Sequence, residues 1–183
     1  MSLSFDKWTL KTVRYDKSMM NWLEERRYEW IPLASDALQR IIAGSTVLLL
    51  TDDERDWYAQ YILTTLNKPL RNRPFIPIYD IKKLFPFVKE LKTNEQLDLL
   101  FDMFDMSFEN YFIWYVGKVN AAGYVSIAKR REDSFLWIMD ADMQNNFTLK
   151  SYDELLDIKL MQLFRLFDRS IDAAIFGEVV FDQ

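Results

Sequence analysis

The amino-acid sequence predicts an α/β fold, a three-layer sandwich in which helices cover both faces of a mostly parallel, five-stranded sheet. Three observations predict it. Apolar stretches alternate with helical patterns along residues 45–183, the first stretch (Ser45–Leu50, STVLLL) has no polar alternation, and only four glycines and five prolines interrupt the chain. We therefore expect a single domain over residues 1–183, in which a helical amino-terminal part (1–44) precedes βα repeats (45–183).

Residues 1–44 show a helical pattern. A short opening helix carries Phe5, Trp8 and Val13, and a longer helix ends near Gly44. Pro32 lies within the longer pattern, where a proline cannot donate the backbone hydrogen bond that a helix needs. We expect the longer helix to be kinked or restarted at this proline.

The βα repeats begin with the strand at Ser45–Leu50, which we expect to be covered on both faces, as in a parallel sheet. Thr51 and Glu54 have the spacing of a capping box and predict that a helix starts here. The second strand, Phe75–Tyr79, contains Pro77, which cannot donate to a strand ladder. We expect this strand at or near an edge of the sheet, or bulged.

The second half of the repeats contains the remaining strands. Two further capping boxes, Thr93–Gln96 and Ser151–Glu154, predict helix starts, and the helix after the second is the longest, reaching about Phe176. A short helix is expected around residues 123–129, and strands are expected at Asn110–Val116, Ser134–Met139 and Phe147–Leu149. Strands that alternate with helices imply βαβ crossovers, and hence a flavodoxin-like or Rossmann-like sheet.

The last helix is more apolar than one face of a sheet requires. Its apolar stripe recurs at three- and four-residue steps: Leu156, Leu160, Leu163, Phe164, Phe167, Ile171, Ala174 and Ile175. Four more apolar residues widen the stripe: Leu155, Ile158, Met161 and Leu166. A charged face is formed by Glu154, Asp157, Arg165, Asp168 and Asp172. We expect this helix to pack both on its own sheet and on a second protomer, because obligate interfaces resemble a divided core.

The turn after Ser45–Leu50 lies where open parallel sheets bind ligands, beyond the carboxyl ends of the strands. A phosphate site there needs glycines and free backbone N–H groups at the start of the helix. Here the turn holds Asp52, Asp53 and Glu54 without a glycine, and the chain has no glycine-rich phosphate motif. We expect these carboxylates to satisfy the N–H groups of the helix start and to repel phosphate.

Composition excludes several kinds of active site. The chain has no cysteine and no histidine, which removes disulfides, zinc–thiolate sites, thiol nucleophiles, the usual general base and any serine-protease triad. Other side chains could still do chemistry, so an enzyme is disfavoured rather than excluded. We expect no cofactor and no metal. Four acidic residues recur at three- to four-residue spacing: Asp98, Asp102, Asp105 and Glu109. Such a row is more typical of a solvated helix face, and the alternative interpretation is the metal site of a metal-dependent hydrolase.

The charge pattern argues against binding to nucleic acid. The formal net charge is −5, and the basic run Lys129–Arg131 is followed at once by Glu132 and Asp133, as in a solvated loop. The amino terminus lacks the apolar core of a signal peptide. The longest aliphatic run, Val47–Leu50, is far shorter than the ~20 residues of a membrane helix. We expect a cytoplasmic protein that contacts neither nucleic acid nor membrane.

Four collinear segments carry a family resemblance: Asn72–Asp80 (NRPFIPIYD), Phe112–Val119 (FIWYVGKV), Ser134–Met139 (SFLWIM) and, most strongly, Asp153–Asp168 (DELLDIKLMQLFRLFD). Together they resemble the HobA family, bacterial regulators of replication initiation that bind the initiator protein DnaA. The resemblance runs over most of the chain. It implies a sugar-isomerase-like (SIS) fold and a homotetramer that works as a non-enzymatic adaptor. Such a tetramer captures the amino-terminal domain of several DnaA molecules and raises their local concentration at the replication origin.

The resemblance also suggests which residues contact the partner. The related DnaA-binding protein DiaA has a Leu-Phe pair near its carboxyl end that matters for this contact, and Ile175 and Phe176 correspond to it. Packing at a helix end is the alternative role of this pair. Trp57 and Phe85 are further candidate anchors, although Trp57 could equally belong to the core, and Arg55 is a candidate polar contact at the rim.

The alternative function is that of an SIS-type phosphosugar isomerase or sugar-phosphate-binding protein. DiaA keeps a glycine- and serine-rich turn after its first strand. This chain departs from that pattern at Asp52, Asp53 and Glu54, which argues against phosphosugar binding.

Overall fold

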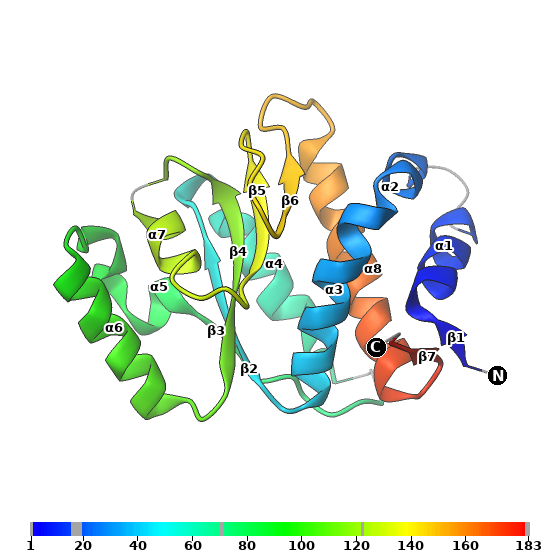
Figure 1. The fold of residues 1–183 in the computed structure, drawn as a ribbon, viewed down its shortest axis with the longest axis horizontal. Helices are drawn as coiled ribbons and strands as arrows, with labels where there is room; N and C mark the ends of the chain where they lie inside the picture. The colour runs from blue at the N-terminus through cyan, green and yellow to red at the C-terminus, as the bar shows by residue number, and fades with distance from the viewer. Residues whose placement is uncertain (1, 16–19, 70–71, 122, 182–183) are drawn as a thin grey trace.

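The computed structural model describes residues 2–15, 20–69, 72–121 and 123–181 and has the predicted fold class (Figure 1). Its main sheet has five strands: β2 (Thr46–Thr51), β3 (Ile78–Asp80), β4 (Tyr111–Lys118), β5 (Phe135–Met139) and β6 (Asn146–Leu149). They lie in the order β3-β2-β4-β5-β6, and neighbouring strands are parallel. This is the order of flavodoxin-like sheets. The edge position expected from Pro77 is confirmed, because β3 is an outermost strand.

Helices cover both faces of this sheet, as Figure 1 shows. One face is covered by α1 (Phe5–Tyr15), α2 (Asn21–Glu25), α3 (Arg27–Ile42), α4 (Asp56–Leu66) and α8 (Leu156–Ile175). The other face is covered by α5 (Ile81–Leu84), the 3-10 helix η2 (Pro86–Glu90), α6 (Asn94–Ser107) and α7 (Tyr124–Ala128). A small second sheet, which the sequence did not predict, pairs β1 (Leu3–Ser4) with β7 (Val179–Val180).

The central strands are buried on both faces, as their uninterrupted apolar sequences predict. Successive side chains point to opposite faces of the sheet. Leu49, Trp114 and Trp137 pack in the core under α3 and α8, whereas Leu48 and Ile113 pack in the core under α6. The sheet therefore separates two cores.

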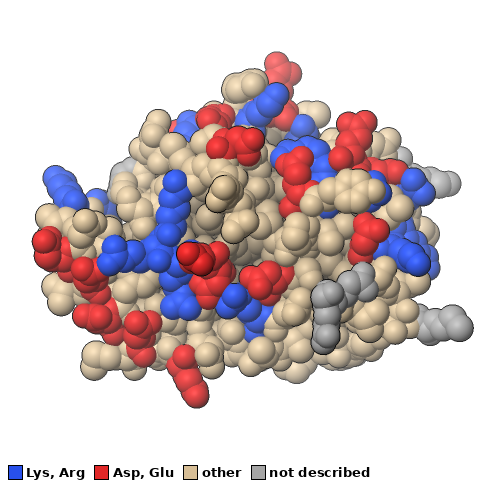
Figure 2. All heavy atoms as spheres, viewed as in Figure 1, with Lys and Arg blue, Asp and Glu red and all other residues tan. Residues whose placement is uncertain are grey.

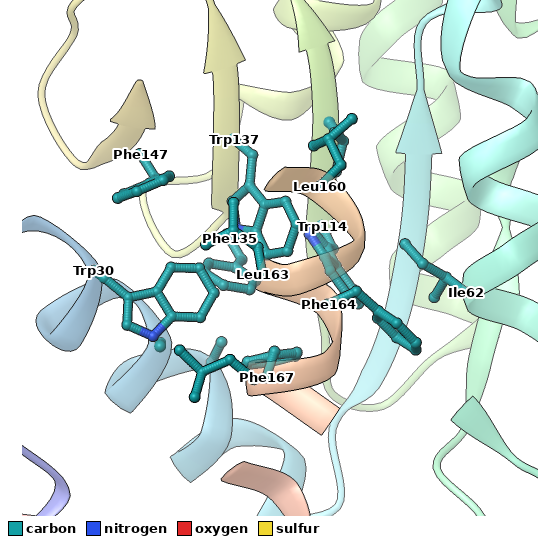
Figure 3. Packing of buried hydrophobic residues seen from close by; sticks show 14 of the residues in the cluster. Trp30, Ile62, Trp114, Phe135, Trp137, Phe147, Leu160, Leu163, Phe164 and Phe167 are labelled. Atoms are coloured by element: carbon teal, nitrogen blue, oxygen red, sulfur yellow. The ribbon is translucent and has the colours of Figure 1, made fainter. Parts of the chain in front are cut away.

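A cluster of aromatic rings lies within the larger core (Figure 3). The ring centroid of Phe167, on α8, lies 4.9 Å from that of Phe135 and 5.2 Å from that of Trp114. Trp30, on α3, meets Phe147 edge-on at 5.6 Å. An aromatic side chain buries roughly 150–250 Å², so at about 25 cal/mol per Å² each ring contributes about 4–6 kcal/mol of gross hydrophobic free energy. These rings anchor α3 and α8 to the sheet.

The helix restart expected at Pro32 lies instead at Arg26. The backbone of Arg26 has φ −102° and ψ 10° between α2 and α3, and α3 continues through Pro32. Because of this break, α2 and Arg26 contact β6 and α8. The Arg26 guanidinium lies over the Phe147 ring at 4.3 Å, and Trp22 Nε1 donates a 2.9 Å hydrogen bond to Gln162. These contacts join segments far apart in the sequence, which is why local patterns misplace the break.

One of the three predicted capping boxes is confirmed. The Thr93 side chain accepts the backbone N–H of Gln96 at 3.3 Å, and the Gln96 side chain accepts that of Thr93 at 3.2 Å. The box at Thr51 is wrong because Thr51 is the last residue of β2 and is fixed in the ladder with β4. The box at Ser151 is wrong because α8 begins only at Leu156, without a side-chain cap.

A buried ion pair interrupts the charged face expected on α8. Asp168 is buried, and its carboxylate accepts a 2.6 Å hydrogen bond from the Arg73 guanidinium. Arg73 also binds Asp172 at 2.6 Å and donates to the carbonyl of Leu66 at 2.7 Å. Arg73 thereby ties the segment after α4 to α8. Leu166, expected on the outer apolar surface, is also buried.

Candidate functional site

The carboxyl ends of β2 and β4 form the topological switch point of the sheet, where doubly wound folds bind their ligands. The chain crosses from β2 to β3 on one side, and β4 lies on the other side of β2. A short 3-10 helix, η1 (Asp53–Arg55), follows β2 and leads into α4. Charged side chains from four elements meet at this point, which makes it the candidate ligand-binding site.

Asp52 and Arg55 form a buried ion pair at the centre of this site. Their side chains are 3 % and 6 % exposed, and Arg55 Nη1 donates to Asp52 Oδ2 at 2.8 Å. The same oxygen accepts the backbone N–H of Lys118 at 2.7 Å, and Arg55 also binds Glu54 at 2.7 Å. The backbone N–H at the end of β4, which could bind a phosphate oxygen, is therefore occupied by a carboxylate of the chain.

Two lysines close the mouth of the site. Lys82 Nζ, from α5, donates to Asp53 Oδ1 at 3.4 Å and also binds Asp56. Lys118 Nζ donates to Glu54 Oε1 at 2.9 Å. The hydrogen bond from Lys118 lowers the pKa of Glu54, so this carboxylate stays ionised at neutral pH.

Two tyrosines and a glycine fill the remaining space. The Tyr124 hydroxyl donates to Asp53 Oδ1 at 3.0 Å, and the Tyr115 hydroxyl donates to the backbone at the end of β4 at 2.7 Å. Burial raises the pKa of both tyrosines well above the usual value, which keeps them neutral. A Cβ added to Gly117 would lie 2.6 Å from the Tyr115 hydroxyl and 2.9 Å from Asp52 Oδ2. The packing here leaves no room for even a methyl group.

The anion-binding groups of the switch point are therefore occupied by the protein's own carboxylates, and a polar hollow of about 300 Å³ at its mouth is itself lined by Asp53, Asp56 and Lys82. An anionic ligand would bind to the N–H, guanidinium and ammonium groups at this site. Each of them binds a carboxylate of the chain instead: the backbone N–H of Lys118, the guanidinium of Arg55 and the ammonium groups of Lys82 and Lys118. The predicted mechanism was wrong in one respect: neither η1 nor α4 has a side-chain cap at its start, so the carboxylates do not cap the helix. Cations brought in by α5 and β4 neutralise them instead.

The acidic row on α6 and the basic run after α7 are surface features that partly neutralise each other. Asp98 forms an ion pair with Arg130, and Asp105 accepts the Tyr111 hydroxyl at 2.8 Å. Within the described part of the chain, no group of three or more acidic side chains is placed to hold a metal ion. The described helices also include none that is long and apolar enough to cross a membrane.

The five side chains predicted to contact a partner lie in three separate places. Arg55 belongs to the buried pair, and Trp57, two residues on, is 41 % exposed. Phe85 is partly buried between α5 and η2. Ile175 packs against the larger core at the end of α8, whereas Phe176 beside it is 58 % exposed. The structure therefore brings together two of these residues at α4 and two at α8, but not all five.

One exposed apolar surface lies where α4 and α8 begin, and we name it the α4–α8 surface: Trp57, Leu155 and Ile158. Leu155 is 52 % exposed and Ile158 is 41 % exposed, as the sequence predicts for the outer side of the last helix. The two helix starts are adjacent, because the Tyr58 hydroxyl donates to the carbonyl of Leu160 at 2.6 Å. Exposed apolar patches of this kind mark contacts with other proteins.

A second apolar surface, which the sequence interpretation missed, is a cavity of about 430 Å³ between η2 and α6. We name it the η2–α6 groove. It is lined by Leu84, Phe85, Pro86, Phe87, Val88, Leu91, Gln96, Leu99, Leu100 and Met103. The signal was available in the sequence, because Leu99, Met103 and Met106 recur at i, i+4 and i+7 beside the core-facing stripe of α6.

Comparison with known proteins finds relatives over almost the whole chain. The HobA family, described as a DNA replication regulator, matches residues 1–181. DNA replication regulator protein HobA from Helicobacter pylori is 30% identical over 183 residues, which cover 96% of this chain and 98% of that protein.

Two solved structures from H. pylori also match. HobA in a HobA–DnaA (domain I–II) complex has a TM-score of 0.77 at 28% identity, covering 97% of this chain and 99% of that one. A HobA crystal structure has a TM-score of 0.76 at 29% identity, covering 98% and 99%. From the family match and this sequence identity, the chain belongs to the HobA family of DNA replication regulators.

Proposed function

We propose that this chain is a non-enzymatic, oligomeric adaptor of the cytoplasm. It binds the amino-terminal region of the replication initiator DnaA and promotes the assembly of DnaA at the origin. Membership of the HobA family supports the regulatory role, and the similarity to HobA in the HobA–DnaA (domain I–II) complex supports the partner. The observation that carries the proposal is the switch point, where a buried Asp52–Arg55 pair takes the place of a ligand.

The chemistry of the site supports a binding role rather than catalysis. A catalytic group needs a perturbed pKa and access to a substrate. The carboxylates of the switch point are bound by Arg55, Lys82 and Lys118, and the buried tyrosines are held neutral. The sequence has no histidine or cysteine, which removes the commonest general base and the thiol nucleophile.

Self-association into a homotetramer is the second part of the proposal. The exposed residues Trp57, Leu155 and Ile158 of the α4–α8 surface give it an apolar contact. Copies of DnaA held on one scaffold meet at a high effective concentration, so their assembly is favoured without new contacts between them. DnaA would contact the origin. This chain would not bind DNA itself, because its net charge is −5.

The candidate contacts follow from exposure. Phe176 is the exposed anchor for the partner, and Ile175 fixes its position by packing against the core. Trp57, the other exposed candidate, belongs to the α4–α8 surface. Arg55 is buried, so it acts by holding the turn that carries Trp57. Phe85 contributes to the η2–α6 groove.

A calorimetric titration of the purified chain with DnaA domains I–II tests the proposal, together with sedimentation to measure mass. We expect saturable binding and a mass near four times the 22.0 kDa of the chain. Absence of binding at concentrations on the order of tens of micromolar would contradict the adaptor role. Sugar phosphates should leave the melting temperature unchanged. A large rise would indicate a phosphosugar-binding protein instead, because a ligand that binds only the native state stabilises it.

A further inference from the structure

Helix α6 carries three stripes of side chains along its length. The first faces the core and consists of Leu97, Leu100, Phe101 and Phe104. The second is apolar and lies beside the first: Leu99 and Met106 are exposed, whereas Met103 is partly buried against the core. The third is the acidic row described above. A helix that only covers a sheet needs one apolar stripe, so the second stripe is available for another contact.

Leu99 and Met103 of the second stripe line one wall of the η2–α6 groove, and η2 lines the other. Leu99 is 68 % exposed and Phe87, on η2, is 71 % exposed. Inside the groove, the partly buried ring of Phe85 packs against Phe104 with 5.4 Å between centroids, so the floor is fixed by the core. A concave apolar surface with a rigid floor and exposed rims is suited to an apolar helix face.

The charge beside the groove indicates what binds there. Helix α6 contains no lysine or arginine and four acidic residues: Glu95, Asp98, Asp102 and Asp105. Figure 2 shows acidic side chains along α6 at the left edge of the molecule. The nearby lysines Lys83 and Lys89 face an adjoining polar hollow, which shares Pro86 and Val88 with the groove and also contains Asp53 and Asp56.

A second copy of this chain fits the groove poorly. It would bring the same acidic α6, and like charges facing each other across an interface oppose docking. A helix with lysine or arginine on one flank is attracted instead.

We propose that the η2–α6 groove binds an amphipathic helix of the partner protein. The apolar side of that helix enters the groove, and a flank rich in lysine and arginine lies along the acidic row of α6. This inference rests on the proposed function, so the partner is the amino-terminal region of DnaA. Leu99 and Met103 lie about 6 Å apart along α6 at 1.5 Å per residue, which matches about one turn of the bound helix.

Titration of DnaA domains I–II against variants of the full chain tests this site. Leu99→Asp and Phe87→Asp each place a charge in the groove wall at an exposed position, where the fold should tolerate it. We expect both to weaken binding about tenfold or more, as for central interface anchors. Asp102→Lys should weaken binding and make it less sensitive to salt. The matched control is Tyr28→Asp, at a 69 % exposed position on α3, which should bind like the wild type.

The outcomes separate the two proposals. If the wild type binds DnaA and both groove variants bind equally well, the groove inference is overturned while the adaptor role stands. If the wild type does not bind, both proposals are overturned. If Leu99→Asp lowers the sedimented mass and leaves DnaA binding unchanged, the groove is a contact between copies of this chain, which also overturns the inference.

Discussion

Replacing Arg55 by methionine tests how the switch point is held. Methionine keeps an apolar stem but removes the guanidinium, which donates to Asp52 at 2.8 Å. The Asp52 side chain is 3 % exposed, and its Oδ1 has no hydrogen-bond partner among the described residues. The variant therefore leaves a buried carboxylate that keeps one hydrogen bond, from the backbone N–H of Lys118 at 2.7 Å. Such a charge is costly in the interior.

The expected loss of stability follows from this geometry. Removing one partner of a buried ion pair costs about 3–5 kcal/mol, out of roughly 5–15 kcal/mol for a typical domain. At about 2–4 °C per kcal/mol for a chain of this length, the melting temperature should fall by roughly 6–20 °C. The double variant Arg55→Met with Asp52→Asn keeps an acceptor for the Lys118 N–H but removes the charge. We expect it to recover more than half of the loss.

Urea and thermal unfolding followed by circular dichroism measure these differences. The chain concentration must be the same in every experiment, because the stability of an oligomer depends on it. If Arg55→Met lies within about 1 kcal/mol of the wild type, the size of an ordinary substitution effect, the ion pair does not hold the switch point. A double variant no more stable than Arg55→Met alone would show that the unpaired charge of Asp52 is not the cause of the loss.

Three further predictions concern other sites. Gly117→Ala places a methyl group 2.6 Å from the Tyr115 hydroxyl, and we expect it to lower the free energy of unfolding in urea by about 1–3 kcal/mol. Thr93→Ala removes the side-chain cap of α6 and should cost about 1 kcal/mol in the same assay, whereas no loss would argue against the cap. Burial, together with the hydrogen bond to Asp105, raises the pKa of Tyr111 from 10.0 to about 12. Because the raised pKa belongs to the folded state, its stabilisation is complete below pH 10 and is lost as the pH rises through 12. The stability advantage of the wild type over Tyr111→Phe should therefore shrink across this range, and a constant difference would contradict the assignment.

Much of the fold was predictable because its strongest signals are local. The strand predicted at Ser45–Leu50 contains four consecutive aliphatic residues, which is typical of a strand buried on both faces, and the structure places β2 at Thr46–Thr51. The capping boxes show the limit of such signals. Thr93 and Thr51 have the same spacing to a polar residue, but Thr51 is held in the strand ladder and is not available to cap a helix. A capping-box sequence therefore caps a helix only where its first residue is not already held by tertiary contacts.

The candidate site was predictable only in part. The sequence places acidic residues at the switch point, but their partners come from far along the chain: Lys82 and Lys118 lie 30 and 66 residues after Asp52. Only the folded sheet brings these groups together, so the sequence could not show that cations neutralise the carboxylates. Conversely, the stripe of Leu99, Met103 and Met106 was readable in advance, but its exposure depends on how α6 is rotated against the sheet.

The two apolar surfaces lie on opposite faces of the sheet, which allows one chain to self-associate and to bind a partner at the same time. Trp57 and Ile158 belong to helices that cover the face with the aromatic core, whereas Leu99 belongs to a helix on the other face. Contact between copies through the α4–α8 surface would leave every η2–α6 groove open. The proposed scaffold would then hold one partner helix per chain, as effective concentration requires. If copies met through the groove instead, each contact would remove a binding site, and the capacity for partner would fall below one per chain.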